Sequence, residues 1–257
     1  MIEEALQSGK LTLKPNHTYV SHEAVETTKQ QVQIRFNLDS AESEEVITAD
    51  HLILALGAGA VNASNFNSLS LRPVRGQVEA IPTQMPIEQL NTVLCHKGYM
   101  TPVFEGRHAL GSTYVKNDLS TDARSDETEM NLATHEQALA NTDIVQALQH
   151  DGKARAATRL GSPDHQPVVG ALHNFDSLKE LYTMLGVGKP LTSAPVLPSS
   201  VVSTLTCLGS RGLTTAPLMA EVLVSSLCNE PLPLSNDLLN AVNTSRFMTR
   251  EAIRSQG

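Results

Sequence analysis

Hydrophobic and polar residues alternate along the first fifty residues of the chain. Alternating segments rich in β-branched residues occupy 11–28, 30–38 and 44–49, and polar breaks separate them. Such alternation is typical of strands with one buried face, so it predicts a small antiparallel meander. The run 52–56 contains no polar residue, which predicts a strand covered on both faces, as in a parallel sheet. This strand should end at Gly57, where the backbone can approach a ligand closely.

Strand signals return after a polar loop at 62–70. We expect strands within 71–82, 92–103, 108–115, 153–160, 165–172, 180–185 and 201–208. Residues 115–150 are first acidic and then richer in leucine and alanine, which predicts one or two surface helices. Residues 186–200 form a connection rich in glycine and proline, and further helices are expected at 213–228 and near 235–243.

The order of these elements predicts an α/β fold of mixed α+β type. A covered sheet is expected near both ends of the chain, and an antiparallel sheet is expected in an insert from about residue 70 to 190. The 257 residues suffice for one large domain or two small ones. We therefore expect one discontinuous domain that holds another.

Composition narrows the classes of function. The chain is 40% hydrophobic and 18% charged, and its net charge is -8. This charge argues against a surface covered in nucleic-acid-binding residues, although a local basic patch is compatible with it. Tryptophan is absent and aromatic residues make up 4% of the chain, so binding by stacked aromatic side chains is poorly supported.

The cysteines and the absence of targeting patterns predict a location in the cytoplasm. Cys95, Cys207 and Cys228 include no C-x-x-C pair, and their odd number disfavours a disulfide framework. We interpret them as small buried thiols in a reducing cytoplasm. The chain shows no signal-peptide pattern, no apolar run long enough to span a bilayer and no metal-ligand spacing among its histidines. We therefore expect a cytoplasmic protein without a membrane span or a metal.

A glycine turn between a strand and an apolar helix is the first candidate site. Gly209 and Gly212 flank Ser210 and Arg211, directly after the strand expected at 201–208. Free N–H groups at the start of the helix would stabilise an electron-rich ligand group. The alternative is an ordinary turn that serves packing alone, because short glycine motifs are weak signals.

The helix after this turn should bury a single apolar stripe. The expected stripe consists of Leu213, Ala216, Ala220, Leu223 and Leu227. We expect the hydroxyls of Thr214 and Thr215 to help satisfy the first N–H groups, and Pro217 to lie in the first turn.

The insert contains further residues that could carry chemistry. Arg72 and Arg75 have an odd spacing, which places them on opposite faces of a strand, one toward a pocket and one toward solvent. The other groups are Lys97 and Tyr99 around Gly98, and Arg155 and Arg159 ahead of Asp164 and His165. Each residue alone is more often a solvated or paired surface group than a catalytic one.

Taken in order, these segments resemble one protein family. The segments that carry the resemblance are 50–60, 71–82, 94–103, 157–172, 208–223 and 229–234. They are similar to the carboxy-terminal oxidoreductase part of the bifunctional tRNA 5-methylaminomethyl-2-thiouridine biosynthesis proteins, a relative of glycine oxidase and D-amino acid oxidase. "RPVRGQV" together with "GSRGLTTAPL" is the more specific part of this resemblance, which covers nearly the whole chain.

The resemblance implies a flavin enzyme of the two-dinucleotide-binding type. It implies a partial FAD-binding domain at 1–65 and 191–257 and a substrate domain at 66–190. FAD would oxidise the secondary amine of carboxymethylaminomethyl-(2-thio)uridine at the tRNA wobble position. Hydrolysis of the imine would then release glyoxylate and leave aminomethyluridine, with tRNA as the partner molecule.

The resemblance also implies roles for individual residues. The residues implied in cofactor binding are Gly57, Arg75, Gly209, Ser210, Arg211, Gly212, Leu213 and Thr214, and those implied in catalysis are Arg155 and Tyr99. An arginine in the substrate domain would hold the substrate carboxylate by two parallel hydrogen bonds. The resemblance implies that the glycine turn meets the flavin ring. No G-x-G-x-x-G fingerprint for the ADP half of FAD occurs in residues 1–60.

Two departures from the family pattern accompany these implications. Neither the family's amino-terminal βαβ unit nor its methyltransferase domain has a counterpart in this sequence, so we expect a fragment of a longer protein. "LGSP" resembles an insertion between Arg159 and Asp164, and a Leu-Thr-Thr run replaces the usual residues at 213–215.

Two alternatives remain beside the tRNA-modifying function. One is a small-molecule amine or amino acid oxidase of the glycine oxidase type, and the other is a non-catalytic tRNA-binding remnant. Arg246, Arg250 and Arg254 share one helical face, which favours a strip that contacts phosphates. An ordinary solvated terminal helix explains the same spacing equally well.

Overall fold

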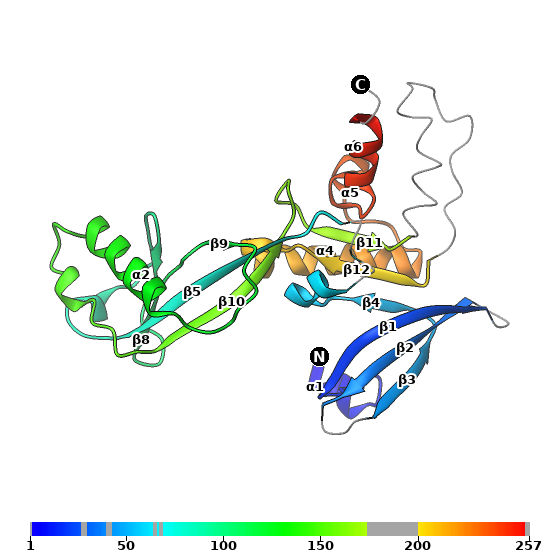
Figure 1. The fold of residues 1–257 in the computed structure, drawn as a ribbon, viewed down its shortest axis with the longest axis horizontal. Helices are drawn as coiled ribbons and strands as arrows, with labels where there is room; N and C mark the ends of the chain where they lie inside the picture. The colour runs from blue at the N-terminus through cyan, green and yellow to red at the C-terminus, as the bar shows by residue number, and fades with distance from the viewer. Residues whose placement is uncertain are drawn as a thin grey trace.

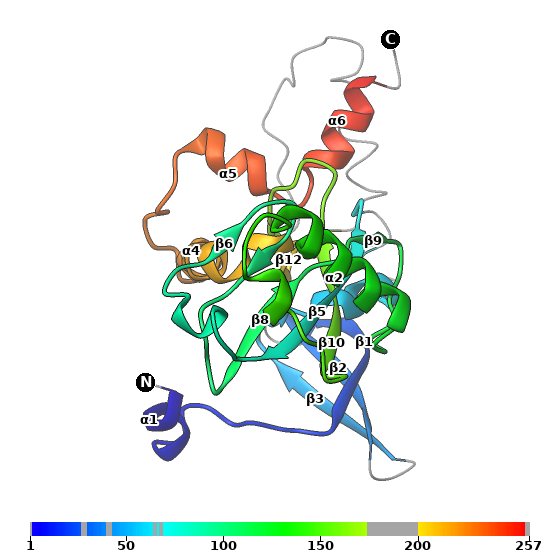
Figure 2. The ribbon, with the colours of Figure 1, turned by 90° about the vertical axis from the view of Figure 1, so that its left-hand side faces the viewer.

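The computed structural model describes residues 2–26, 30–39, 43–63, 66, 69–173 and 200–254. The described part contains three separate sheets together with several helices (Figure 1). The expected strand at 180–185 and residues 186–199 of the expected connection lie outside these ranges. The short helix α1 (Ile2–Gln7) has no buried residue and lies apart from the sheets in Figure 2.

The predicted meander is confirmed. Strands β1 (His17–Glu26), β2 (Gln30–Leu38) and β3 (Glu44–Ala49) pair antiparallel in that order. Val32 and Ile34 of β2 are buried against the next sheet, because alternation places both of them on one face.

The second sheet brings the two ends of the chain together. Its order is β11 (Val168–Ala171), β12 (Val202–Thr206) and β4 (Leu52–Leu54), and β12 pairs parallel with β4. β11 falls within the segment expected for the substrate domain but pairs with β12. Ile53 is 45% exposed, because β4 is an edge strand and the helix on that face packs on β11 and β12. The expected coverage of both faces is therefore wrong at this strand.

The third sheet is the predicted antiparallel insert. Its strand order is β10 (Ala154–Gly161), β5 (Arg72–Pro82), β8 (Arg107–Gly111), β7 (Tyr99–Met100) and β6 (Leu94–Cys95), with β9 (Val115–Lys116) also on β5. Helix α2 (Ser125–Ala138) packs on β5, which confirms a helix in the acidic segment. Sheet and helix occupy one end of an elongated molecule, away from the meander (Figure 1). Short 3-10 turns lie at η3 (Ile87–Gln89) and η4 (Val145–Ala147).

Helix α4 (Gly212–Cys228) confirms the expected helix but buries a different stripe. Its buried apolar residues are Met219, Val222 and Leu223. Leu213 is 99% exposed and Leu227 is 41% exposed, so the predicted stripe is wrong at both ends. Apolar residues occur on more than one side of α4, and the neighbouring elements cover only one of these sides. Periodicity alone therefore selected the wrong side of the helix.

The start of α4 also differs from expectation. The Thr215 hydroxyl donates to the Arg211 carbonyl oxygen at 3.1 Å, and the side chain of Arg211, the residue that precedes the helix, does not cap it. Pro217 lies in the second turn, where its ring leaves the Leu213 carbonyl without a helical donor. The first N–H groups of α4 thus receive no side-chain acceptor from the residue that precedes the helix.

Two of the three carboxy-terminal arginines considered for a phosphate-contacting strip are engaged with Asp164. After α5 (Asn236–Val242), helix α6 (Arg246–Arg254) begins with an arginine that is 5% exposed. Arg246 donates two hydrogen bonds of 3.0 Å to Asp164, and Arg250 donates one of 2.6 Å. These contacts clamp α6 to the turn between β10 and β11, so the first two arginines of the strip are already paired.

The cysteines divide between two environments. Cys207 is 3% exposed, and this burial raises the pKa of its thiol to about 11. Cys95 and Cys228 are exposed, so the interpretation as buried thiols is right for one cysteine and wrong for two.

Candidate functional site

The strand register brings the two residues expected in catalysis to one row of the six-stranded sheet. Arg155 pairs with Val78, Val78 with Gly111, and Gly111 with Tyr99. Directly opposed residues of antiparallel strands point to the same face. Arg155 and Tyr99 therefore share one face of the sheet although the sequence separates them widely.

This face is open and hollowed. A cavity of about 400 Å³ lies on it. Its lining includes Gly76, Val78, Ala109, Arg155, Ala157 and Arg159. We call this side of the sheet the open face, and the side under α2 the covered face.

Arg159 also lies on the open face, although the sequence assigned a catalytic role to Arg155 and Tyr99 and not to Arg159. It is half-buried, and its Nη2 donates to Ser112 Oγ at 3.2 Å. Its guanidinium lies against Gly76, where a Cβ would overlap Nη2. No carboxylate pairs with Arg159 within the described part of the chain. Alternation with Arg155 and a glycine in the neighbouring strand were the signals that could have identified it.

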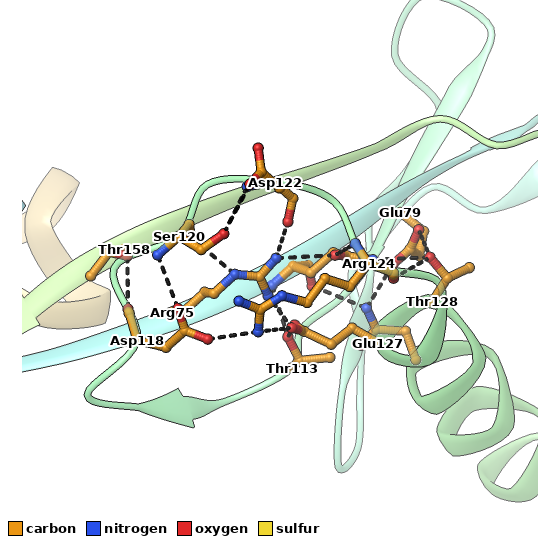
Figure 3. Close-up of polar contacts among 12 residues, drawn as sticks. Arg75, Glu79, Thr113, Asp118, Ser120, Asp122, Arg124, Glu127, Thr128 and Thr158 are labelled. Carbon is orange, nitrogen blue, oxygen red and sulfur yellow. Dashed lines mark hydrogen bonds and ion pairs between the residues drawn. The ribbon is translucent and has the colours of Figure 1, made fainter.

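The covered face holds the other arginine of the predicted site. Arg75 is fully buried and forms an ion pair with Glu127 of α2 (Figure 3). Its Nε donates to the Ser120 carbonyl oxygen at 2.9 Å, and its Nη2 donates to the Asp122 carbonyl oxygen. Arg72 is exposed, so the expected placement of one of these arginines toward solvent is confirmed. Arg75 is buried under α2 and does not line the cavity, so the expected pocket-facing position is wrong. The role of Arg75 in cofactor binding stays a prediction.

Buried polar groups tie α2 to the sheet beside this pair. The Glu79 carboxylate accepts hydrogen bonds of 3.0 Å from Gln77 and Asn131 and lies 3.0 Å from His150 Nε2. His135 Nε2 donates to the Tyr99 carbonyl oxygen at 3.0 Å. The covered face therefore fixes the strand from which Tyr99 reaches the open face.

An ion pair on the loop before α2 completes this network. Arg124 donates to Asp118 at 2.6 Å, and this hydrogen bond lowers the pKa of the Asp118 carboxyl. The Arg124 backbone N–H donates to the Gln77 side chain at 2.7 Å. Each charged group of the loop thus has an assigned structural partner.

Two glycine turns lie against the far end of β10. They are η1 (Gly57–Asn62) and η5 (Gly209–Arg211), and both contact β10. Gly57 has a φ of 55° and Gly209 a φ of 60°, a backbone conformation that glycine adopts without steric cost. Nothing lies within 4 Å of a Cβ built at either glycine, so a ligand could approach both turns.

The residues expected to hold the cofactor surround this end of the sheet. Ser210, Arg211, Leu213 and Thr214 are exposed, and Gly212 is the first residue of α4. The uncapped N–H groups of α4 suit the electron-rich edge of a flavin ring. The donor set therefore fits the ring half of FAD. The individual cofactor contacts stay predictions.

The described residues contain neither a metal-binding cluster nor a candidate membrane span. No group of three or more histidine, cysteine, aspartate or glutamate side chains is arranged to hold a metal ion there. None of the helices in the described ranges is long and apolar enough to cross a membrane.

Several curated proteins are similar to this chain in sequence. The chain is 48% identical over 243 residues to the tRNA 5-methylaminomethyl-2-thiouridine biosynthesis bifunctional protein of Pseudoalteromonas atlantica, covering 92% of this chain and 34% of that protein. The protein of the same name from Aeromonas hydrophila is 35% identical over 256 residues, covering 99% and 37%. The chain thus spans about a third of the length of these curated relatives.

Solved structures show the same fold at low sequence identity. Glycine oxidase from Geobacillus kaustophilus superposes with a TM-score of 0.59 at 16% identity, covering 88% of this chain and 52% of that chain. Iminodiacetate oxidase from a Chelativorans species superposes with a TM-score of 0.61 at 16% identity, covering 95% and 56%. Residues 13–226 match the family described as FAD dependent oxidoreductase. The chain therefore belongs to the FAD-dependent oxidoreductase family, and its sequence corresponds to the oxidoreductase part of the bifunctional tRNA-modifying proteins.

Proposed function

We propose that this chain is the substrate-binding and flavin-facing part of an FAD-dependent oxidoreductase that acts on carboxymethylaminomethyl-(2-thio)uridine in tRNA. The observation that carries the proposal is the Arg159 guanidinium, which is exposed to a cavity, held by Ser112 and without a carboxylate partner in the described structure. A guanidinium in this state is suited to bind a carboxylate by two parallel hydrogen bonds.

In this proposal Arg159 anchors the carboxylate of the substrate's carboxymethyl group. Arg155 lies on the same face of β10 and adds positive charge, and Tyr99 contacts the substrate from the other end of the row. The anchored carboxylate would hold the adjacent C–N bond toward the glycine turns, since β10 contacts both of them. Holding the reacting bond in one orientation is the main contribution that a protein makes to flavin chemistry.

The cofactor would lie at the glycine turns. We propose that Gly57 and residues 209–214 contact the ring half of FAD, while the first N–H groups of α4 stabilise negative charge on it. FAD, when bound, would accept a hydride equivalent from the methylene carbon of the carboxymethyl group, and the N–H proton would leave to solvent, so that the C–N bond becomes an imine. Water then adds to the imine, glyoxylate leaves and aminomethyluridine remains on the tRNA. The family also implies a methyltransferase domain as partner and a cytoplasmic location.

Turnover of defined substrates tests this function. The full chain is incubated with FAD and with tRNA that carries carboxymethylaminomethyluridine, and the nucleosides are analysed by mass spectrometry. We expect aminomethyluridine and stoichiometric glyoxylate, and both products should be lost in Arg159→Gln.

Two other results would replace the proposal. Oxidation of sarcosine or glycine without turnover of the tRNA would show a small-molecule amine oxidase. Binding of tRNA without flavin binding or turnover would show a non-catalytic remnant. Flavin absorbance of the purified chain, before and after addition of FAD, separates these two results.

A further inference from the structure

The open face carries more unpaired positive charge than a carboxylate anchor requires. Arg159 pairs with Val74 in the register, and Val74 pairs with Lys116 of β9. Directly opposed residues share a face, so Lys116 joins Arg155 and Arg159 on the open face. Lys116 and Arg155 are both exposed. Neither forms an ion pair with any residue that the structure describes.

Three other arginines of the same sheet and its loops are compensated, whereas Arg72 at the start of β5 is exposed. They form the pairs Arg75 with Glu127, Arg107 with Asp151, and Arg124 with Asp118. Glu79 contributes to the cavity wall, but its carboxylate accepts hydrogen bonds on the covered face. The open face is therefore a local positive surface in a chain whose net charge is -8.

The spacing of the three cations exceeds the size of a free amino acid. Lys116 lies two strands from Arg159, a separation of about 10 Å at the usual spacing between strands. Arg155 lies four residues from Arg159 along β10, or about 13 Å. A free amino acid that binds Arg159 offers no second anion at these distances, whereas a nucleotide carries its phosphate on the far side of the base and sugar.

We propose that Lys116, across the strands from Arg159, and Arg155, along β10 from it, form a phosphate-binding surface that selects an amine carried on RNA over a free amine. The proposal rests on the proposed function, because it assigns Arg159 to the substrate carboxylate. The unpaired positive charge suits a polyanion, and the carboxylate site beside the two cations favours a strand of RNA that carries the reacting amine.

Salt-dependent RNA binding tests this surface. The full chain is titrated into a fluorescein-labelled single-stranded RNA at several NaCl concentrations, and fluorescence anisotropy gives Kd. Each phosphate contact contributes about 0.7 to the slope of log Kd against log salt. Lys116→Ala and Arg155→Ala should each weaken binding several-fold and reduce that slope by about 0.7.

Arg35→Ala is the matched control. Arg35 is an exposed cation on the meander, and it pairs with Glu44 at 3.0 Å. This substitution removes the same charge away from the open face and should leave Kd and the salt slope at their original values. The proposal is overturned if Lys116→Ala binds RNA as tightly as the original chain, or if Arg35→Ala loses as much affinity as Lys116→Ala. Circular dichroism verifies that each variant is folded.

Binding and turnover measurements together distinguish failure of the phosphate-binding surface from failure of the proposed oxidation. RNA binding that depends on Lys116, without oxidation of tRNA or sarcosine, would support the surface and remove the reaction. Sarcosine binding that depends on Arg159, with RNA binding insensitive to both outer cations, would keep the carboxylate site and overturn the surface.

Discussion

Two arginines on opposite faces of one sheet differ in what surrounds them. Arg75 is fully buried under α2 and meets Glu127 and two backbone carbonyl oxygens. Arg159 is half-buried, lies over Gly76 and meets only a serine hydroxyl at 3.2 Å among the described residues. Both come from motifs that the sequence alone ranks as equal. The complete set of partners gives Arg75 a structural role, and the unfilled set leaves Arg159 available for a ligand.

The largest effect is expected where the covered face is broken. Glu127→Gln leaves the Arg75 guanidinium buried without an anion, and removing one partner of a buried ion pair typically costs about 3–5 kcal/mol. We expect the free energy of unfolding to fall by that amount, measured by urea denaturation followed by circular dichroism. Glu136→Gln, at an exposed position of the same helix, is the control and should change stability by less than about 0.5 kcal/mol. Equal effects of the two substitutions would contradict a structural role for Arg75.

Asp164, which pairs with Arg246 and Arg250, is a partly exposed counterpart of the buried Glu127. Burial by itself raises the pKa of Asp164, but hydrogen bonds from Arg246 and Arg250 outweigh it and lower the pKa well below the ordinary 3.8. A depressed folded pKa stabilises the fold above the unfolded value, and this contribution is lost as the pH falls below 3.8. Asp164→Asn should cost about 1.5–3 kcal/mol at neutral pH, because it weakens hydrogen bonds between charged groups.

The acid dependence checks the cause of that loss. The stability of the original chain should decline more steeply than that of Asp164→Asn as the pH is lowered through this range, measured by urea denaturation at each pH. Asp143→Asn, at an exposed position, should decline like the original chain. Parallel pH curves for the original chain and Asp164→Asn would show that the arginines do not stabilise this carboxylate.

A smaller effect on stability is expected at the open face. Gly76→Ala places a Cβ against the Arg159 guanidinium and 3.1 Å from the Thr113 carbonyl oxygen. Overpacking of this kind typically costs about 1–3 kcal/mol, and displacement of Arg159 should also weaken binding of a carboxylate. Gly161→Ala is the matched control, since the nearest atom to its Cβ is 3.8 Å away. Thermal melting and sarcosine titration measure the two effects. If Gly76→Ala bound sarcosine as tightly as the original chain, the position of Arg159 against Gly76 would not be required for carboxylate binding.

The sequence predicts the elements of this fold better than their surroundings. Alternation identifies the meander and β10, and the run at 52–56 identifies β4. It does not show that Ile53 faces an uncovered edge, because coverage depends on elements distant along the chain. The stripe of α4 fails for the same reason, since apolar residues occur on more than one side of the helix.

The sequence identifies which residues are candidates for the site, but it does not show how they are arranged in space. An odd spacing separates Arg72 from Arg75 correctly, while the identity of the partner, Glu127, depends on where α2 packs. Arg155 and Tyr99 share a row only through the register of four strands. Such registers are set by long-range packing, which composition and motif spacing do not contain.

Binding of a carboxylate at Arg159 tests the central claim most directly. Sarcosine is titrated into the full chain in the presence of FAD, and its Kd is measured by isothermal calorimetry for the original chain, Arg159→Gln and Arg72→Gln. Arg72 is an exposed arginine at the end of β5, so it controls for loss of one positive charge nearby. We expect Arg159→Gln to weaken sarcosine binding at least about tenfold, or about 1.4 kcal/mol, and Arg72→Gln to bind sarcosine as the original chain does. Equal affinity of Arg159→Gln and the original chain would contradict the central claim.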